Sequence, residues 1–186
     1  MKKQPEITDM TKSIFVEVFC DFYRTRSIDR ISVKELAAKA GYSRATFYNY
    51  FTDVYDLLEY IEDELVSDLM KRVEAQLDEN RSLDGFIDSF VKSVTENEKY
   101  IGVYMNESNS SSFIEKMKQK MIPLLLNVFS VPDTDLRARY ALEFYISGLI
   151  SVLGSWFRDG QNMPVNALAE LIQGILKEGI FSQIGR

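Results

Sequence analysis

The chain has 186 residues, of which 46% are apolar, 27% charged and 12% aromatic. This composition suffices for a buried core and excludes a disordered or low-complexity chain. A single cysteine excludes an internal disulfide, and the lack of histidine removes the commonest metal ligand and the usual general base near neutral pH. We therefore expect a globular protein without metal, cofactor or enzymatic activity.

The net charge of −6 is unevenly distributed along the chain. Residues 1–56 hold nine lysines and arginines against eight aspartates and glutamates, whereas residues 57–186 hold thirteen against twenty. The acidic total therefore does not exclude nucleic acid as a partner of the first part.

Apolar residues recur at helical spacing throughout, and no strand is expected. A first helix is expected over residues 8–25, with one apolar face made of Met10, Ile14, Phe15, Val18, Phe19 and Phe22. A long helix to about residue 79 follows from apolar residues at four-residue steps: Leu57, Ile61, Leu65, Leu69, Val73 and Leu77. The other helices, about nine in all, are expected at 32–40, 44–50, 83–97, 99–107, 113–129, 134–158 and 164–180.

Two segments bear on location. Charged residues interrupt every N-terminal stretch that could act as a secretory signal, which predicts a cytoplasmic protein. Residues 140–157 carry one charge, Glu143, and reach the length of a membrane helix. Their serines and glycines favour instead a helix that protein buries on nearly all sides, so no membrane contact is expected.

Residues 31–51 predict a helix-turn-helix. Ser32 and Glu35 form a capping box, and Gly41 provides a left-handed stop to a helix whose apolar face is Val33, Leu36, Ala37 and Ala40. Ser43 caps a second short helix, with Ala45, Phe47 and Phe51 toward the inside. That second helix is narrow enough to enter the DNA major groove.

The sequence Gly-Tyr-Ser-Arg-Ala-Thr-Phe-Tyr-Asn-Tyr-Phe at 41–51 resembles the DNA-binding domain of the TetR family of bacterial transcription regulators, over about residues 8–58. The resemblance implies an all-α fold, with a helix-turn-helix domain at 1–56 joined by a long helix to a ligand-binding and dimerisation domain at 57–186. It also implies a repressor that binds double-stranded DNA at a palindromic operator as a homodimer, until a small-molecule effector tilts the long helix. The DNA-facing residues would be Ser32, Lys34, Ser43, Arg44, Ala45, Thr46, Tyr48, Asn49 and Tyr50.

One position departs from the family pattern. The family commonly has lysine at the start of the fourth helix, where this chain has Val54. We expect the backbone N–H groups of that helix start to remain available to a phosphate. This departure leaves open an alternative function, a TetR-like co-regulator that acts through a partner protein with weak or no DNA binding.

The second domain offers two kinds of candidate residue. Small and polar side chains share one face of the 134–158 helix, and apolar side chains share one face of the last helix, which predicts a symmetric helical interface. Its candidates are Glu143, Ser147, Ser151, Gly154, Leu168, Leu171, Ile172 and Ile175. Aromatic residues that line an effector pocket or fill the core are Phe86, Phe90, Tyr104, Phe113, Tyr145 and Trp156.

Overall fold

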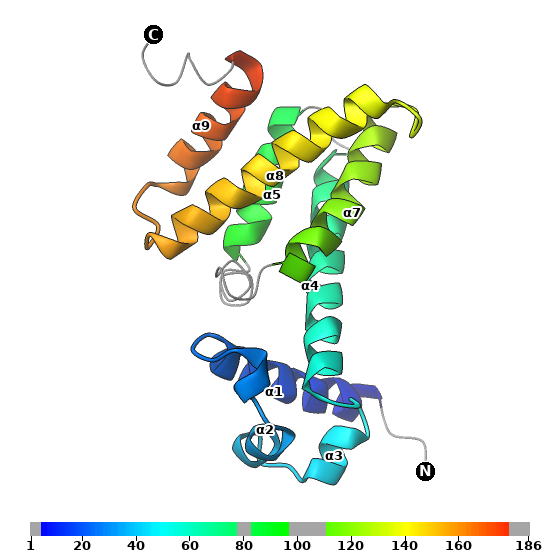
Figure 1. Cartoon of the computed structure of the whole chain (residues 1–186), viewed down its shortest axis with the longest axis vertical. Coiled ribbons are helices and arrows are strands. Elements are labelled where there is room, and N and C mark those ends of the chain that lie inside the picture. The colour runs from blue at the N-terminus through cyan, green and yellow to red at the C-terminus, as the bar shows by residue number, and fades with distance from the viewer. Residues whose placement is uncertain (1–4, 78–82, 97–110, 179–186) are drawn as a thin grey trace. The chain divides into compact units, whose positions relative to one another are not determined.

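The structure, a computed structural model, describes residues 5–77, 83–96 and 111–178. These residues form helices and no strand, so the predicted all-α fold is confirmed. The helix predicted at 99–107 lies outside the described residues. The helices are α1 (Pro5–Tyr23), α2 (Val33–Lys39), α3 (Arg44–Tyr48), α4 (Val54–Leu77), α5 (Leu83–Glu96), α7 (Ser111–Val128), α8 (Leu136–Arg158) and α9 (Val165–Glu178), with a 3₁₀ turn η1 (Ile28–Arg30) (Figure 1).

The chain divides into two compact units, Met1–Glu64 and Leu65–Arg186. In the first unit α1 packs against α2, and α2 packs against α3. The core is built from fully buried side chains: Phe15, Phe19, Leu36, Phe47 and Leu57. The Phe15 and Phe47 rings meet edge to face with their centroids 5.3 Å apart, which ties α1 directly to α3.

Two residues expected in the core of this unit lie outside it. Met10 is 68% exposed, because the buried face of α1 runs through its neighbour Thr11, and neighbouring helical residues point about 100° apart. Ala45 is also exposed, since α3 has only five residues and turns Phe47 inward. The expected inner faces were wrong at these two positions and correct at Phe47 and Phe51.

The apolar row that the sequence predicts along α4 is buried at all but one of its described positions. Leu57, Ile61, Leu69 and Val73 are buried, whereas Leu65 is half-exposed and its neighbour Val66 is buried instead. Neighbouring helical residues point about 100° apart, so the buried face at this point lies to one side of the predicted row. Leu65 is also the residue at which the second compact unit begins.

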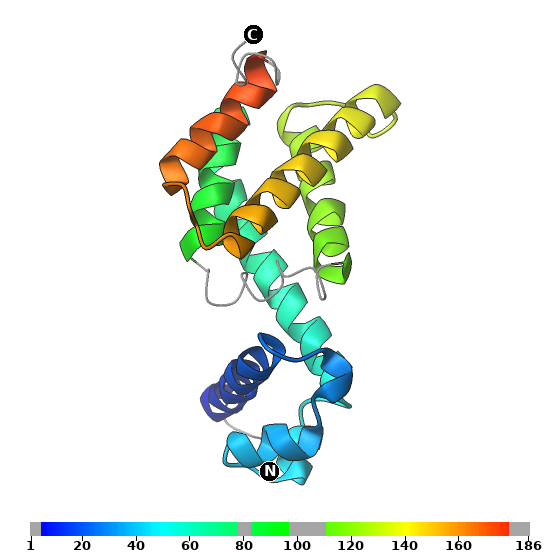
Figure 2. The ribbon, with the colours of Figure 1, turned by 60° about the vertical axis from the view of Figure 1, so that its left-hand side comes forward.

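In the second unit α7 packs against α8, and α5 packs against α9, as Figure 2 shows. Phe90 and Phe113 lie in the core of this unit with no exposed surface. The Phe86 ring stacks on Phe90 at a centroid distance of 6.0 Å. A side-chain hydrogen bond of 2.7 Å from Gln173 to Asp88 also joins α9 to α5.

The expectation that protein covers α8 on nearly all sides was wrong for the single chain. Ile146, Ile150 and Leu153 are buried, but Tyr140 and Phe144 are each 73% exposed. Within the described residues, α8 is the helix whose length and composition would suit a membrane span. Only 33% of its apolar stretch is buried. Its exposed face is therefore apolar surface that the described residues leave uncovered.

Candidate functional site

The turn between α2 and α3 is held by Gly41, which has a φ of +75°. The backbone N–H of Tyr42 donates to Ala37 O at 2.9 Å, and that of Gly41 donates to Ala38 O at 3.2 Å. These two bonds form a Schellman motif, which satisfies the last carbonyls of α2. A glycine in the left-handed region therefore fixes the direction in which the chain enters α3.

The capping box at the start of α2 is present. Ser32 Oγ accepts from the Glu35 backbone N–H at 3.3 Å and donates to Glu35 Oε2 at 2.7 Å. The Ser32 hydrogen bond and the nearby Arg26, whose Nη1 lies 3.5 Å from Glu35 Oε1, lower the pKa of the Glu35 carboxyl. The Ser32 hydroxyl, which we expected to contact DNA, thus donates its proton to Glu35 in an intramolecular hydrogen bond.

Most of the residues predicted to face DNA from α3 are exposed. Ser43 caps the helix by accepting from Thr46 N at 3.1 Å, and the two hydroxyl oxygens lie 3.0 Å apart. Arg44, Tyr48 and Asn49 are exposed. The remaining predicted residues are Ser43 and Ala45, which are exposed, and Thr46 and Tyr50, which are half-buried.

Three basic side chains around these helices keep their charge available. Arg30, Lys34 and Arg44 are exposed and form no salt bridge with any residue that the structure describes. Lys39 differs, because its Nζ lies 3.4 Å from Asp21 Oδ2 and 4.8 Å from the centre of the Phe22 ring. The sequence alone could not show that Lys39, unlike the other three basic residues, forms an ion pair within the protein.

The start of α4 is closed to a phosphate by the protein's own carboxylates. Asp53 Oδ1 accepts from the backbone N–H groups of Tyr55 and Asp56, at 2.8 and 2.9 Å. Asp56 Oδ2 accepts from the Thr52 N–H at 2.7 Å. Our expectation that these N–H groups stay available was wrong, because Asp53 occupies the helix start as an N-cap.

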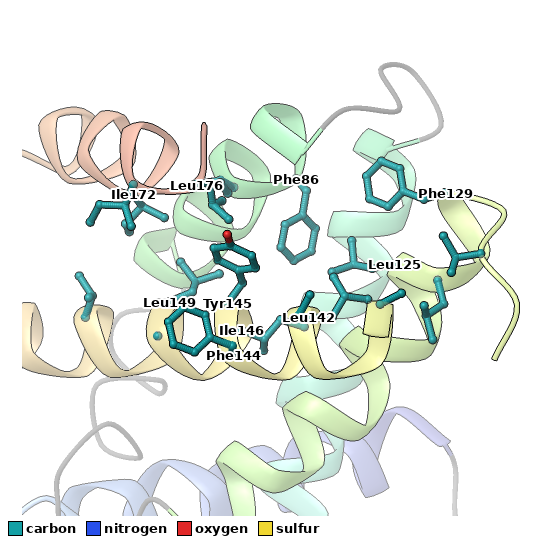
Figure 3. Close-up of a pocket in the computed structure, with 18 residues that line it drawn as sticks. Phe86, Leu125, Phe129, Leu142, Phe144, Tyr145, Ile146, Leu149, Ile172 and Leu176 are labelled. Atoms are coloured by element: carbon teal, nitrogen blue, oxygen red, sulfur yellow. The ribbon is translucent and has the colours of Figure 1, made fainter. Parts of the chain in front are cut away.

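The second unit contains a pocket of about 560 Å³ between α5, α7, α8 and α9, open to solvent on one side (Figure 3). Of the aromatic residues singled out from the sequence, Phe86 and Tyr145 line it. Phe90 and Phe113 lie in the core, and Trp156 donates from Nε1 to Met163 O at 2.8 Å. Tyr104 lies outside the described residues.

Most of the pocket wall consists of aliphatic residues that sequence analysis did not separate from the core. Aliphatic cavity and core residues look alike in a helical pattern, and no signal in one sequence distinguishes them. The lining residues are Phe86, Ile87, Leu125, Leu126, Phe129, Val131, Ala138, Ala141, Leu142, Phe144, Tyr145, Ile146, Gly148, Leu149, Val152, Ile172, Ile175 and Leu176.

The residues predicted for a dimer interface are not all on free surface. Glu143 Oε1 lies 2.6 Å from Lys118 Nζ on α7, and Gly154, Leu168 and Ile172 are buried within the chain. Ser151 is exposed. Half-buried positions are Ser147, Leu171 and Ile175.

The exposed face of α8 contains larger side chains that our selection missed. Leu136 is 62% exposed, and Tyr140 and Phe144 follow it at four-residue steps. This row could have been found in the sequence, because residues four apart share a helix face. The predicted interface followed the small and polar residues of this helix instead.

No group of three or more histidine, cysteine, aspartate or glutamate side chains that could hold a metal ion is present among residues 5–77, 83–96 and 111–178.

Two family models match the chain. The family model described as "Transcriptional regulator C-terminal region" matches residues 81–178, which is more than half of the chain and makes it a transcriptional regulator. The model described as "Bacterial regulatory proteins, tetR family" matches residues 23–61, which include the helix-turn-helix. The chain therefore belongs to the TetR family of transcriptional regulators. None of the curated proteins compared with it matches.

Several solved structures share the fold. The fatty acid degradation regulator FadR from Bacillus halodurans is 17% identical with a TM-score of 0.77, over 97% of this chain and 98% of that one. NalD of Pseudomonas aeruginosa, the secondary repressor of the MexAB-OprM efflux pump, is 19% identical with a TM-score of 0.68, over 94% and 97%. A tetR-family regulator from Streptomyces coelicolor is 21% identical with a TM-score of 0.63, over 88% and 77%.

Family membership establishes the general role. TetR-family regulators are DNA-binding proteins that are generally not enzymes. Homodimers and small-molecule effectors are typical of the family.

Proposed function

We propose that this protein is a cytoplasmic repressor that binds a palindromic operator as a homodimer and leaves it when a small-molecule effector binds. The observation that carries the proposal is the exposed surface of α3, which presents Arg44 in its first turn without an ion pair to any described residue. The Gly41 turn and the buried Phe47 hold that helix rigidly on the core. Such a helix suits entry into a major groove.

Four exposed side chains of this surface have a chemical role in the proposal. Arg44 donates to guanine O6 and N7, and Asn49 reads adenine. Tyr48, 56% exposed, and Lys34 contact phosphates. Because Ser32 and Thr46 already bond to neighbouring groups, we assign them secondary roles in positioning.

The uncovered face of α8 supports the proposed dimerisation. Leu136, Tyr140 and Phe144 form one exposed apolar row, and Ser151 continues on the same face. A second copy that packs the same face against it by twofold symmetry would remove this surface from water, and twofold symmetry matches a palindromic operator. Phe144→Glu is expected to shift the protein to monomer in analytical ultracentrifugation. Persistence of an unchanged dimer would reject this face.

DNA binding is tested by a mobility shift with DNA from beside the protein's own gene. We expect a sequence-specific shift that weakens with salt, because lysine and arginine displace counterions from phosphates. Arg44→Ala is expected to weaken specific binding by about 1–3 kcal/mol. The matched control is Arg137→Ala, an exposed arginine on α8. Equal losses of DNA affinity in both variants would contradict a role of Arg44 in base recognition.

A reporter assay decides between repression and activation. NalD is a repressor, whereas another solved structure of this fold, DhaS, is an activator of the dihydroxyacetone kinase operon. Lower reporter output in the presence of the protein supports repression, and higher output contradicts it.

The alternative function is a co-regulator that acts through a partner protein. It is favoured by the start of α4, where Val54 stands at the position of the family's common lysine and the carboxylate of the preceding Asp53 accepts from the Tyr55 and Asp56 N–H groups. A protein that shows no specific shift at any salt, and that co-elutes with a candidate partner in size-exclusion chromatography, would replace the repressor by the co-regulator.

A further inference from the structure

We infer that the effector of this protein is an uncharged, largely aliphatic molecule with one hydrogen-bonding group, which Tyr145 binds. The inference rests on the proposed function only in assigning the pocket a regulatory role, since the ligand class itself is argued from the wall of the pocket.

Among the residues that the structure describes, none that lines the pocket is charged. Its eighteen residues are apolar or glycine, except for the hydroxyl of Tyr145. Two charged side chains of the same helices are engaged by other residues, since Glu143 pairs with Lys118 and Asp88 accepts a hydrogen bond from Gln173. A carboxylate or phosphate buried here would lose its water and gain no counter-charge, which is strongly unfavourable. The enclosed part of the wall therefore selects against an ionised group, and a charged ligand could bind only with its charge at the side that is open to solvent.

The shape of the pocket suits an extended molecule. Its lining on α8 runs from Ala138 to Val152, fourteen residues along a helix that rises about 1.5 Å per residue, which gives about 21 Å. Residues from the other three helices accompany α8 along this length, from Phe129 at one end to Ile172 at the other in Figure 3. A volume of about 560 Å³ lies within the range of small-molecule sites.

Tyr145 supplies the polar contact. Its hydroxyl oxygen points from α8 toward Leu176, beside Phe86, in Figure 3. The hydroxyl forms no hydrogen bond with any residue in the described part of the chain, and Tyr145 is 39% exposed rather than sealed in the core. It is therefore free to donate to, or accept from, one ligand group.

Gly148 provides a position at which the pocket can be filled. It lines the pocket, and a Cβ atom added to it would meet no atom within 4 Å. A larger side chain there occupies open space instead of displacing the core. It also replaces a glycine inside a helix by a residue of higher helix propensity, which favours folding.

The ligand class is tested by displacement of the neutral fluorescent dye N-phenyl-1-naphthylamine from the purified full-length protein at pH 8. Dodecan-1-ol is expected to displace the dye at least tenfold more tightly than dodecanoate, which is ionised at this pH. Each methylene added from octan-1-ol to dodecan-1-ol is expected to tighten binding about fourfold. Equal or tighter binding of dodecanoate, or no binding of the dye, would overturn the inference.

Two substitutions locate the site. Tyr145→Phe is expected to weaken dodecan-1-ol about threefold to tenfold and to leave the dye, which does not need the hydroxyl, within twofold. Gly148→Leu is expected to weaken both by tenfold or more, whereas the matched Gly148→Ala has a smaller effect. Unchanged binding in both Tyr145→Phe and Gly148→Leu places the ligand elsewhere and contradicts the inference.

The outcome is separable from that of the proposed function. Dye displacement needs no DNA, so it measures the ligand class even if no operator binding is found. A mobility shift with and without dodecan-1-ol then reports regulation. Tight alcohol binding without release of DNA would contradict effector-driven repression and leave the ligand class intact.

Discussion

Asp53→Asn isolates the charge that closes the start of α4. Asp53 Oδ1 accepts from the Tyr55 and Asp56 backbone N–H groups at 2.8 and 2.9 Å. Asparagine retains an Oδ1 acceptor of the same shape and is also a preferred N-cap. The substitution therefore keeps the cap and removes one negative charge from each DNA-binding unit of a dimer. We expect operator binding to become tighter.

The size of the effect follows from Coulomb's law. With a phosphate about 7 Å from the carboxylate in a water-like dielectric, the repulsion is about 0.6 kcal/mol. Two subunits on one operator give about 1 kcal/mol, which corresponds to about fivefold tighter binding at low salt. At 0.15 M salt the Debye length of about 8 Å reduces the gain to roughly half in free energy.

Fluorescence anisotropy with a labelled operator, at several salt concentrations, measures this change. Glu64→Gln is the matched control, because this exposed carboxylate lies eleven residues further along α4, about 16 Å away by helix rise and two Debye lengths at 0.15 M salt. Equal gains in both variants, or none for Asp53→Asn, would refute the reasoning. A urea titration accompanies the assay, since the lost charge–dipole interaction costs about 0.3–1 kcal/mol of stability.

Three further predictions concern stability in urea titrations. Gly41→Ala should lower the free energy of unfolding of the first unit by about 1–2 kcal/mol, because a residue with a side chain is disfavoured at a φ of +75°. No loss would contradict the conclusion that this turn requires glycine. Burial, aided by Glu62, raises the pKa of Tyr23 from 10.0 to about 12, so stability should fall as pH rises between these values, and less so in Tyr23→Phe. Glu143 raises the pKa of Lys118, so the stability from this pair should be complete below pH 10.5 and lost above it, a loss that Lys118→Met should lack.

Local sequence patterns predicted the first unit well. The Ser32 cap, the Gly41 turn and the buried Phe47 each depend on residues within one or two helical turns, and all three are present in the structure. Helix starts and stops are local, since hydroxyl caps and left-handed glycines satisfy backbone groups of their own segment. The helix-turn-helix could therefore be predicted from about twenty residues.

Side-chain partners from distant segments could not be predicted in the same way. Lys39 pairs with Asp21 of α1, and Glu143 pairs with Lys118 of α7. Lys39 and Glu143 are charged residues on helix faces. From the sequence alone, Lys39 could contact DNA and Glu143 could lie in a dimer interface. Their ion pairs depend on which helices pack together, and that information is absent from helical periodicity.

The helical spacing of apolar residues predicted an all-α protein, the composition excluded a histidine-based site, and the 41–51 sequence indicated a family that binds DNA. The tertiary structure decided which side chains remain available. In the folded chain Asp53 caps the start of α4, and Tyr140 and Phe144 are exposed on α8. Tyr145 lines an apolar pocket between the helices. The reason is that secondary structure depends on neighbours along the chain, whereas exposure and cavities depend on how separate helices pack.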